Sequence, residues 1–375
     1  MRIGFYAPLK SPRHPVPSGD RRVAQLLWQA LERGGHTPIL ASELRVYDPA
    51  GDVTAQAVSE RAAAREVARL LDQYRRAPDT APALWFTYHN YYKAPDLLGP
   101  TLARDLGIPY VIAEASHAPK RAAGPWASWH ARAASATQAA DRLLCFTALD
   151  RAMLAKLTPA ERLVDLPAFL DTTPYRELDH AEARASVAAR SGLDPAQPWL
   201  VAVAMMRQGD KLESYRRLAA ALHLIDTWPW QLLVIGDGEA RIEVAAALAP
   251  FGRRVAFLGA MPPVEIPSLL AAGDIYVWPA ANEAFGMALL EAQAAGLPVV
   301  AGRVRGVPDV VRENETALLT AETAESFADA LRRLLADRPL RDRMALAARH
   351  FAFNDRGLES AAARLDRALR AAAAR

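Results

Sequence analysis

Two glutamates flank a glycine in the stretch NEAFGMALLEAQAAGLPVV, residues 282–300. Glu283 and Glu291 are eight positions apart, and Gly286 lies between them at the expected start of a helix. The backbone N–H groups at a helix start lack partners within the helix, so they can bind a phosphate or sugar hydroxyls. The two carboxylates should then face hydroxyl groups, such as the vicinal pair of a ribose. In the alternative interpretation, Glu283 caps the helix and Glu291 is a solvated helical residue. The spacing of the two residues alone favours this alternative.

The elements that position these residues are short apolar runs that alternate with amphipathic helices. Near-continuous apolar runs are typical of parallel strands buried on both faces, and their alternation with helices predicts the α/β class. We expect two doubly wound, Rossmann-like domains facing a cleft, with ligands at the carboxyl ends of the strands. The predicted strands are 2–7, 82–89, 109–116, 142–148, 199–206, 231–238, 255–260, 275–280 and 298–303.

The length of 375 residues suggests two domains, because a domain holds roughly 150 residues. Turn-forming residues gather between 168 and 195. We therefore expect an N-terminal, acceptor-side domain over 1–168 and a C-terminal, donor-binding domain over 169–356. An alanine- and arginine-rich helix over 357–375 should pack back on the first domain. Within that domain, a four-proline loop that includes Pro17 precedes a helix that begins after Ser18 and ends at Gly34.

Cysteine content and charge exclude several classes of protein. The single cysteine, Cys145, rules out a disulfide framework and a thiolate metal site. Pro8 and Lys10 interrupt the N-terminus too early for a signal peptide, and no apolar run approaches the ~20 residues of a spanning helix. We expect a cytoplasmic protein, with a peripheral place at the inner face of a membrane as the alternative.

Basic residues are slightly in excess in the first half of the chain. Residues 1–190 carry 24 basic and 20 acidic side chains, and residues 191–375 carry 21 and 22. A nucleic-acid-binding protein usually shows a denser basic patch, so no nucleic-acid partner is expected. Two interpretations stay open: solvated arginines, or a first half that meets an anionic acceptor or a membrane surface.

The opening stretch resembles the E-x7-E signature of retaining glycosyltransferases with the GT-B fold, family 4, also called group 1. The resemblance continues through GRVRGVPDVV and extends back over LLVIGDGEAR and VAVAMMRQGDKLESY, so that it covers most of 199–320. It implies a metal-independent hexosyltransferase that moves a hexose-type sugar from a nucleotide sugar to a hydroxyl acceptor. The acceptor would be a glycan, a glycolipid or a small molecule.

The resemblance also implies roles for individual residues. Arg207 and Lys211, in the loop after VAVAMM, would hold the donor diphosphate. The forked guanidinium of the arginine and the compact ammonium charge of the lysine suit that task. Glu283 would contact the transferred sugar, and Glu291 would hold the ribose. The remaining implied residues are His117 near the sugar, Gly19 near the phosphates or the acceptor, Leu258 and Gly259 at the base, and Phe285, Gly286 and Met287 as backbone donors. For His117 a purely structural role is an equal alternative.

The sequence departs from the family pattern at three places. Three residues separate Arg207 from Lys211, where the family often has R-x4-K-G, and Leu212 follows the lysine. Arg305 precedes Gly306 where a glycine pair is common, and Asp309 replaces a glutamate. Arg305 would affect which donor or acceptor the site accepts.

The mechanism implied by the family is front-face attack, in which the leaving phosphate takes the acceptor's proton. Positive side chains and helix amides would stabilise the charge that grows on the leaving group. No D-x-D motif occurs, the nearest form being Asp237-Gly238-Glu239. We therefore expect no metal and no cofactor beyond the nucleotide sugar.

Two other functions remain as alternatives. A sugar-nucleotide epimerase of related fold would convert the donor without an acceptor, and a decayed, non-catalytic module would only bind sugar nucleotides or glycans. A nicotinamide enzyme is disfavoured because GDGEAR lacks the third glycine of G-x-G-x-x-G. Basic and aromatic residues could take an anionic, lipid-linked or polysaccharide acceptor, and the candidates are Lys10, Arg13, His14, Lys120, Arg121, Trp126 and Trp129. Core packing is the competing explanation for the two tryptophans.

Overall fold

The chain folds into two compact units. The structure is a computed structural model that describes residues 1–16 and 18–374, so Pro17 of the expected first loop and Arg375 of the expected last helix lie outside the described residues. The first unit comprises Met1–Pro167 and Leu358–Arg375, and the second comprises Ala168–Gly357. The chain thus leaves the first unit, forms all of the second and returns.

Each unit contains one six-stranded sheet in which every strand pairing is parallel. In the first unit the order is β2-β1-β3-β4-β5-β6. Its elements are β1 (Arg2–Tyr6), α1 (Gly19–Arg33), β2 (Thr37–Leu40), α2 (Val53–Arg76), β3 (Leu84–Asn90), α3 (Gly99–Leu106), β4 (Tyr110–Ala115), α4 (Ala127–Ala139), β5 (Arg142–Cys145), α5 (Ala148–Leu154), β6 (Leu163–Asp165) and α13 (Leu358–Ala373).

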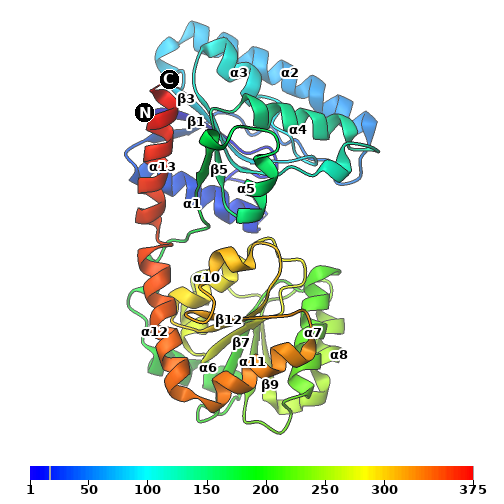
Figure 1. Cartoon of the computed structure of the whole chain (residues 1–375), viewed down its shortest axis with the longest axis vertical. Helices are drawn as coiled ribbons and strands as arrows, with labels where there is room; N and C mark the ends of the chain where they lie inside the picture. Colours follow the sequence, from blue (N-terminus) through cyan, green and yellow to red (C-terminus); the bar gives the residue numbers. More distant parts are fainter. Residues whose placement is uncertain (17, 375) are drawn as a thin grey trace. The chain divides into compact units, whose positions relative to one another are not determined.

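In the second unit the strand order is β12-β11-β10-β7-β8-β9. Its elements, green to orange in Figure 1, are α6 (His180–Ser191), β7 (Trp199–Val203), α7 (Asp210–His223), β8 (Gln231–Ile235), α8 (Arg241–Leu248), β9 (Val255–Gly259), α9 (Ile266–Ala271), β10 (Ile275–Trp278), α10 (Met287–Ala294), β11 (Val299–Gly302), β12 (Ala317–Thr320), α11 (Ala324–Ala336) and α12 (Arg338–Asn354).

The strand order reverses once in each sheet, between β1 and β3 in the first and between β7 and β10 in the second. This confirms the predicted α/β class with two doubly wound sheets. At such a point the connections after the two neighbouring strands run to opposite faces of the sheet and leave a crevice at the carboxyl ends. Each unit therefore has one place where a ligand is expected.

All nine predicted strands are present, whereas β2, β6 and β12 were not predicted. Each of these three strands lies at an edge of its sheet. An edge strand has one neighbour and is less enclosed, so its sequence need not be a continuous apolar run. In β2, for example, Pro38 interrupts the pattern, and only that residue is buried.

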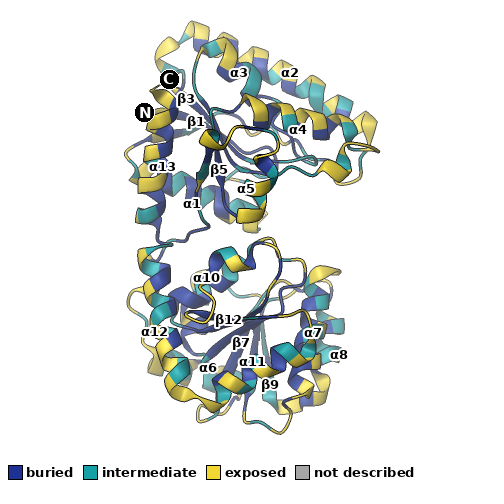
Figure 2. Ribbon diagram, viewed as in Figure 1, coloured by how far each residue is buried: buried dark blue, intermediate teal, exposed yellow. Residues whose placement is uncertain are grey.

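Buried faces of the helices pack on the strands, and the strands themselves are buried (Figure 2). Ser18 caps α1 through a hydrogen bond from the backbone N–H of Arg21, and Gly34 ends the helix, as predicted. Helix α13 lies beside α1, where Nε2 of His36 is 3.2 Å from Oδ1 of Asp366. Its apolar face is fully covered, since Leu369 exposes 0% of its surface.

Candidate active site

The candidate site of the second unit lies at the reversal between β7 and β10. Lys211, in the first turn of α7, forms an ion pair with Oε2 of Glu283, in the loop after β10. The indole N–H of Trp278 donates to the same oxygen over 3.2 Å, and the ammonium of Lys211 lies 5.2 Å from the centre of the Trp278 ring. Only Oε1 of Glu283 then lacks a hydrogen bond among the residues described. The geometry joins a cation, a carboxylate and an aromatic face at the expected ligand side.

Part of the prediction for Lys211 was wrong, because this residue lies in α7 and not in the preceding loop. The helix begins at Asp210 directly after Gly209, whose φ of 79° is left-handed. Arg207 does lie in the loop, and its side chain is exposed. No partner of that guanidinium occurs among the residues that the structure describes. Arg207 is therefore available to a ligand, whereas Lys211 already has one carboxylate.

The loop between β10 and α10 has an unusual backbone. Ala280 and Asn282 have positive φ angles of 61° and 51°, and Gly286 has one of 75°. A side chain at Gly286 would place its Cβ 2.5 Å from Cδ1 of Leu289, so Leu289 would have to shift, and the left-handed φ itself favours glycine. Non-glycine residues in this conformation cost free energy and are often found at binding sites.

The start of α10 lies within this loop. Gly286 is its N-cap, and no side chain caps the helix among the residues described. Met287 is the first helical residue, and Phe285 is half-buried in front of it. The helix start predicted near Gly286 is confirmed, with N–H groups that no side chain satisfies. Glu291 is the fifth residue of α10.

The carboxylates of Glu283 and Glu291 both act on one buried phenol. Tyr276 of β10 donates its hydroxyl to the backbone oxygen of Val203 over 3.2 Å. Burial raises the pKa of Tyr276 well above its ordinary value, and the negative charges of Glu283 and Glu291 raise it further. Both carboxylates are therefore close enough to this phenol for their charges to act on it.

A chain of polar contacts borders the loop. Asn282 donates from Nδ2 to Oδ2 of Asp210 over 2.8 Å, and Arg305 donates from Nη1 to Oδ1 of Asn282 over 3.2 Å. Arg305, one of the departures from the family pattern, thus lies next to the loop that holds Glu283. Sequence reasoning missed Trp278, Asn282 and Asp210, because no spacing rule links a strand end or a helix start to Glu283.

Leu258 and Gly259 lie at the carboxyl end of β9, an edge strand. Both are half-buried. Three strand spacings separate β10 from β9 in the order β10-β7-β8-β9, which amounts to about 14 Å. The residues predicted for the base and for the sugar are therefore at opposite ends of an elongated region.

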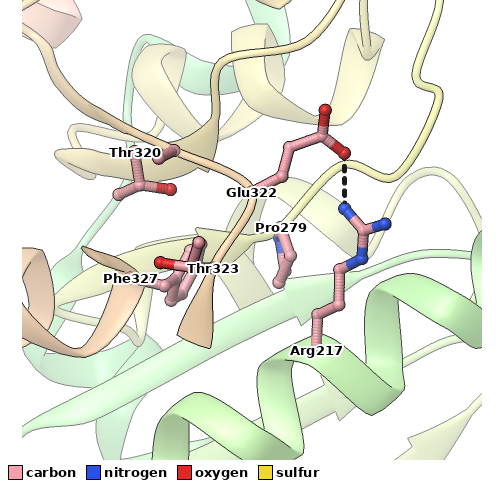
Figure 3. A pocket seen from close by; sticks show the side chains of 7 residues that line it. Arg217, Pro279, Thr320, Glu322, Thr323 and Phe327 are labelled. Carbon is pink, nitrogen blue, oxygen red and sulfur yellow. Dashed lines mark hydrogen bonds and ion pairs between the residues drawn. The ribbon is translucent and has the colours of Figure 1, made fainter. Parts of the chain in front are cut away.

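The second unit also contains a small pocket (Figure 3). It is lined by Arg217, Pro279, Thr320, Ala321, Glu322, Thr323 and Phe327. The guanidinium of Arg217 bridges Glu213 at 3.0 Å and Glu322 at 2.6 Å, which ties α7 to the segment before α11. Because its charges are paired and it contains none of the predicted donor residues, we assign this pocket a structural role.

In the first unit, Gly19 is the first residue of α1, and a Cβ added there would meet no atom within 4 Å. Packing within the unit does not explain this glycine.

His117 follows β4 and is half-buried, with its ring centre 5.0 Å from that of His130. Burial, followed by the positive charges of His130 and Lys156, lowers the pKa of His117. The imidazole of His117 is thus protonated less readily than a free imidazole.

The two tryptophans proposed for the acceptor differ in environment. Trp129 exposes 0% of its surface, which confirms core packing for this residue. Trp126 is half-buried and donates from Nε1 to the backbone oxygen of Asp48 over 3.2 Å. The guanidinium of Arg121 lies 4.9 Å from the Trp126 ring centre, and the ammonium of Lys93 lies 5.6 Å from it. A cationic and aromatic surface therefore remains near α4. Lys10, Arg13, His14 and Lys120 lie in loops or in a short 3₁₀ turn of the same unit.

No group of three or more histidine, cysteine, aspartate or glutamate side chains is arranged to hold a metal ion among residues 1–16 and 18–374. Within the same residues no helix is both long and apolar enough to cross a membrane.

Comparison with known sequences places the second unit in a family. Residues 203–351 match the family described as glycosyl transferases group 1. The chain is 36% identical over 222 residues to D-inositol 3-phosphate glycosyltransferase of Nocardia farcinica. The aligned region covers 56% of this chain and 48% of that protein. It is 31% identical over 256 residues to alpha-D-kanosaminyltransferase of Streptomyces kanamyceticus, covering 65% and 66%. The chain thus spans about half the length of the first relative and about two thirds of the second.

Solved structures show the same fold over the whole chain. Sucrose-phosphate synthase from Thermosynechococcus elongatus has a TM-score of 0.72 at 20% identity, covering 99% of this chain and 98% of that one. The Anabaena protein HepE, solved in complex with UDP, has a TM-score of 0.75 at 17% identity, covering 99% and 100%. At such identities the similarity establishes the GT-B fold and nothing further.

Proposed function

Because the chain belongs to the glycosyl transferases group 1 family, we propose that it transfers a hexose-type sugar from a nucleoside-diphosphate sugar to a hydroxyl acceptor. We propose that the anomeric configuration is retained. The observation that carries this proposal is the ion pair between Lys211 and Glu283 at the reversal of the strand order, beside the uncapped start of α10. A decayed module has no need for a cation and a carboxylate at this point.

The donor lies along the carboxyl ends of β10, β7, β8 and β9 in this proposal. Arg207 and Lys211 neutralise the diphosphate, and the ammonium of Lys211 has donors left beyond the one used by Glu283. The amides at Phe285, Gly286 and Met287 bind the β-phosphate or the sugar. Glu283 holds a sugar hydroxyl through its unbonded Oε1, Glu291 holds the ribose, and Leu258 and Gly259 border the base.

The reaction exchanges one bond at the anomeric carbon for another. The bond from this carbon to the β-phosphate oxygen breaks, a bond to the acceptor oxygen forms on the same face, and the hydroxyl proton passes to the leaving diphosphate. Negative charge grows on the diphosphate, so the fixed charges of Arg207 and Lys211 stabilise the transition state more than the ground state. These protein cations supply what a metal supplies elsewhere, and we propose that no metal is required.

Gly19 and His117 belong to the first unit, so we propose that they contact the acceptor. Gly19 allows a ligand to approach the start of α1, and His117 provides a hydrogen bond to a hydroxyl. Arg121 and Lys93 around Trp126 support an acceptor with an anionic or lipid-linked part. We propose a cytoplasmic protein that contacts a membrane face only if its acceptor is lipid-linked.

The first test is thermal stabilisation of the purified chain by UDP, GDP, ADP and NAD. A ligand present at 100 times its Kd should add about 2.7 kcal/mol to the free energy of unfolding. We expect one nucleoside diphosphate to stabilise the wild type, and Glu291→Ala and Arg207→Ala to abolish the shift. Arg216→Ala, an exposed change in α7, is the matched control. Stabilisation by none of the three diphosphates would refute the donor site.

A second test separates a transferase from an epimerase. The matching nucleotide sugar is incubated with and without a mixture of hydroxyl acceptors, and the products are followed by NMR. An epimerase converts the donor alone, whereas the proposed transferase releases nucleoside diphosphate faster when an acceptor is present. A new α-linkage from an α-linked donor shows retention, and a β-linkage refutes it.

A further inference from the structure

The first unit contains a cluster of acidic and imidazole groups that the donor site does not use. It consists of Asp20, His89, Glu114 and Asp150, and we call it the acid–imidazole cluster. Asp20 lies in the first turn of α1, His89 near the end of β3, Glu114 near the end of β4 and Asp150 in the first turn of α5. Four elements that are distant in the sequence thus contribute one side chain each.

The cluster lies where the strand order of the first sheet reverses. Asp20 follows the connection from β1, and His89 is the last but one residue of β3, the strand on the other side of the reversal. Nδ1 of His89 is 3.3 Å from Oδ1 of Asp20, so the two side chains meet across this point. Doubly wound sheets bind ligands at such a place. The side chain of Asp20 is 36% exposed and that of His89 15%, so Asp20 borders solvent while Nδ1 of His89 is itself enclosed.

Some of the polar atoms in the cluster are satisfied by neighbouring side chains. Asp150 accepts from the hydroxyl of Thr147 over 2.7 Å and from that of Ser116 over 3.2 Å. Burial raises the pKa of the Tyr88 phenol, and the negative charges of Glu114 and Asp20 raise it further. The two hydroxyl contacts occupy both carboxylate oxygens of Asp150 and fix its position.

Two enclosed atoms have no hydrogen-bond partner among the residues described. They are Oε2 of Glu114 and Nδ1 of His89, the latter close to Asp20 but not aligned for a hydrogen bond. An enclosed polar atom without a partner costs free energy, and native structures seldom keep one without a reason. Both residues also have left-handed backbones, with φ of 57° for Glu114 and 66° for His89. Two adjacent strands therefore end in unsatisfied groups held by strained backbone.

The chemistry of the cluster determines what it binds. Burial raises the pKa of Glu114 to about 7, with Asp20 and Asp150 adding to that effect and His89 opposing it. Glu114 and then Asp20 raise the pKa of His89 against its burial. Lys10 and the phenols of Tyr88 and Tyr91 also face these groups. Three carboxyl groups disfavour a phosphate or carboxylate, whereas an acid near its pKa and an imidazole can each accept from or donate to a hydroxyl.

An aromatic ring forms one wall of the cluster. The ring of Tyr91 stacks on that of His89 with centres 4.5 Å apart and planes inclined by 24°. A flat aromatic wall beside hydroxyl-binding groups suits a ring whose faces carry C–H bonds and whose edges carry hydroxyls.

We propose that the acid–imidazole cluster binds an uncharged, hydroxyl-bearing ring of the acceptor, with hydroxyl groups bonded to Oε2 of Glu114 and to Nδ1 of His89. This inference deepens the proposed function and rests on it. Any anionic part of the acceptor then lies elsewhere, toward Arg121 and Lys93. The cluster selects which portion of the acceptor enters this edge of the first sheet.

The test uses the full chain and two neutral rings, myo-inositol and methyl α-glucopyranoside, with an inositol phosphate as the anionic probe. Binding at millimolar concentration is followed by saturation-transfer NMR. We expect saturable binding of at least one neutral ring and a loss of about tenfold or more in affinity in Glu114→Ala and in His89→Ala. Glu114→Gln, which keeps hydrogen-bonding capacity, should retain part of the binding. Asp79→Ala, exposed before the amino end of β3, is the control.

Stabilisation by the nucleoside diphosphate is measured on the same samples, because it reports on the second unit and on folding. Unchanged nucleotide binding with lost ring binding supports the inference. Neutral-ring binding that persists in both alanine variants would overturn it. So would saturable binding of the phosphate alone, or of none of the three probes, while the nucleotide still binds. Absence of nucleotide binding in the wild type would instead refute the proposed function.

Discussion

Lys211 and Glu283 form an ion pair, although 72 positions separate them in the chain. Lys211 lies in the helix after β7 and Glu283 in the loop after β10, and these two strands are neighbours in the second sheet. The residue proposed for the diphosphate and the residue proposed for the sugar are therefore held as one unit before any donor binds. The indole of Trp278 supports both, by a hydrogen bond to the carboxylate and by its ring face toward the ammonium. The site is to this extent preorganised, which is how charged groups contribute most to catalysis.

Replacement of Lys211 by alanine should lower kcat/KM by about 10²–10³-fold. The change removes a cation from the leaving group and leaves Glu283 without its partner, so Lys211→Arg should recover part of the activity. Steady-state kinetics with the donor identified by thermal shift provides the measurement. Arg216→Ala, on the same helix, should retain full activity, and a Lys211→Ala variant with unchanged kcat/KM would contradict the assigned role.

The two glycines at helix starts should respond differently to alanine. Gly286→Ala should destabilise the protein by about 1–3 kcal/mol, because its φ is 75° and its Cβ would overlap Leu289. Gly19→Ala should change stability by less than about 0.5 kcal/mol, because no atom lies within 4 Å of the added Cβ. Urea unfolding measures both. A loss of activity in Gly19→Ala at full stability would show that a ligand approaches there, and full activity would exclude such an approach.

Glu114→Gln should make the protein more stable at pH 8 than the wild type by about 2 kcal/mol, before any acceptor is added. The folded pKa of Glu114 is raised from 4.5 to about 7, so the folded state binds the proton more tightly than the unfolded state. Stability therefore falls as the pH rises from about 4.5 through 7. The raised pKa of His89 acts in the same direction, since its stabilisation is lost as the pH rises past its folded pKa.

Urea unfolding of both proteins at pH 5 and pH 8 measures this effect. The difference between variant and wild type should be small at pH 5 and largest at pH 8. Asp79→Asn, exposed in the same unit, should show no such dependence on pH. A difference that is equal at the two pH values would mean that Glu114 titrates as an ordinary carboxyl group.

Removal of divalent metal should leave the transfer rate unchanged within about twofold, since Arg207 and Lys211 supply the positive charge. The purified protein is treated with EDTA, and the initial rate is compared before and after addition of Mg²⁺ or Mn²⁺. A loss of activity with EDTA that Mn²⁺ restores would refute metal independence.

Leu369→Ala in α13 should destabilise the protein by about 2–5 kcal/mol, because this side chain is fully buried where α13 lies beside α1. Leu346→Ala, at 73% exposure in α12, is the matched control and should have little effect. Thermal unfolding followed by circular dichroism measures both variants. Equal stability of the two would show that α13 contributes little to the first unit.

The sequence predicted the central strands and the start of α10 because these depend on local patterns. Buried parallel strands are apolar throughout, and a glycine before an apolar run indicates a helix start. Three of the four edge strands, β2, β6 and β12, were missed because fewer neighbours enclose them. The acid–imidazole cluster was missed for another reason: Asp20, His89, Glu114 and Asp150 are separated by long stretches of chain, and only the strand order brings them together. Likewise, nothing in the sequence around Lys211 shows that its ammonium meets Glu283.

The return of the chain to the first unit through α13 sets an order for folding during synthesis. The ribosome completes residues 168–357 before it makes α13, so the second unit can fold while the first still lacks its last helix. Until then the apolar face of α1 that α13 covers remains exposed to solvent or to chaperones. The part of the protein that is translated first is therefore the part that matures last.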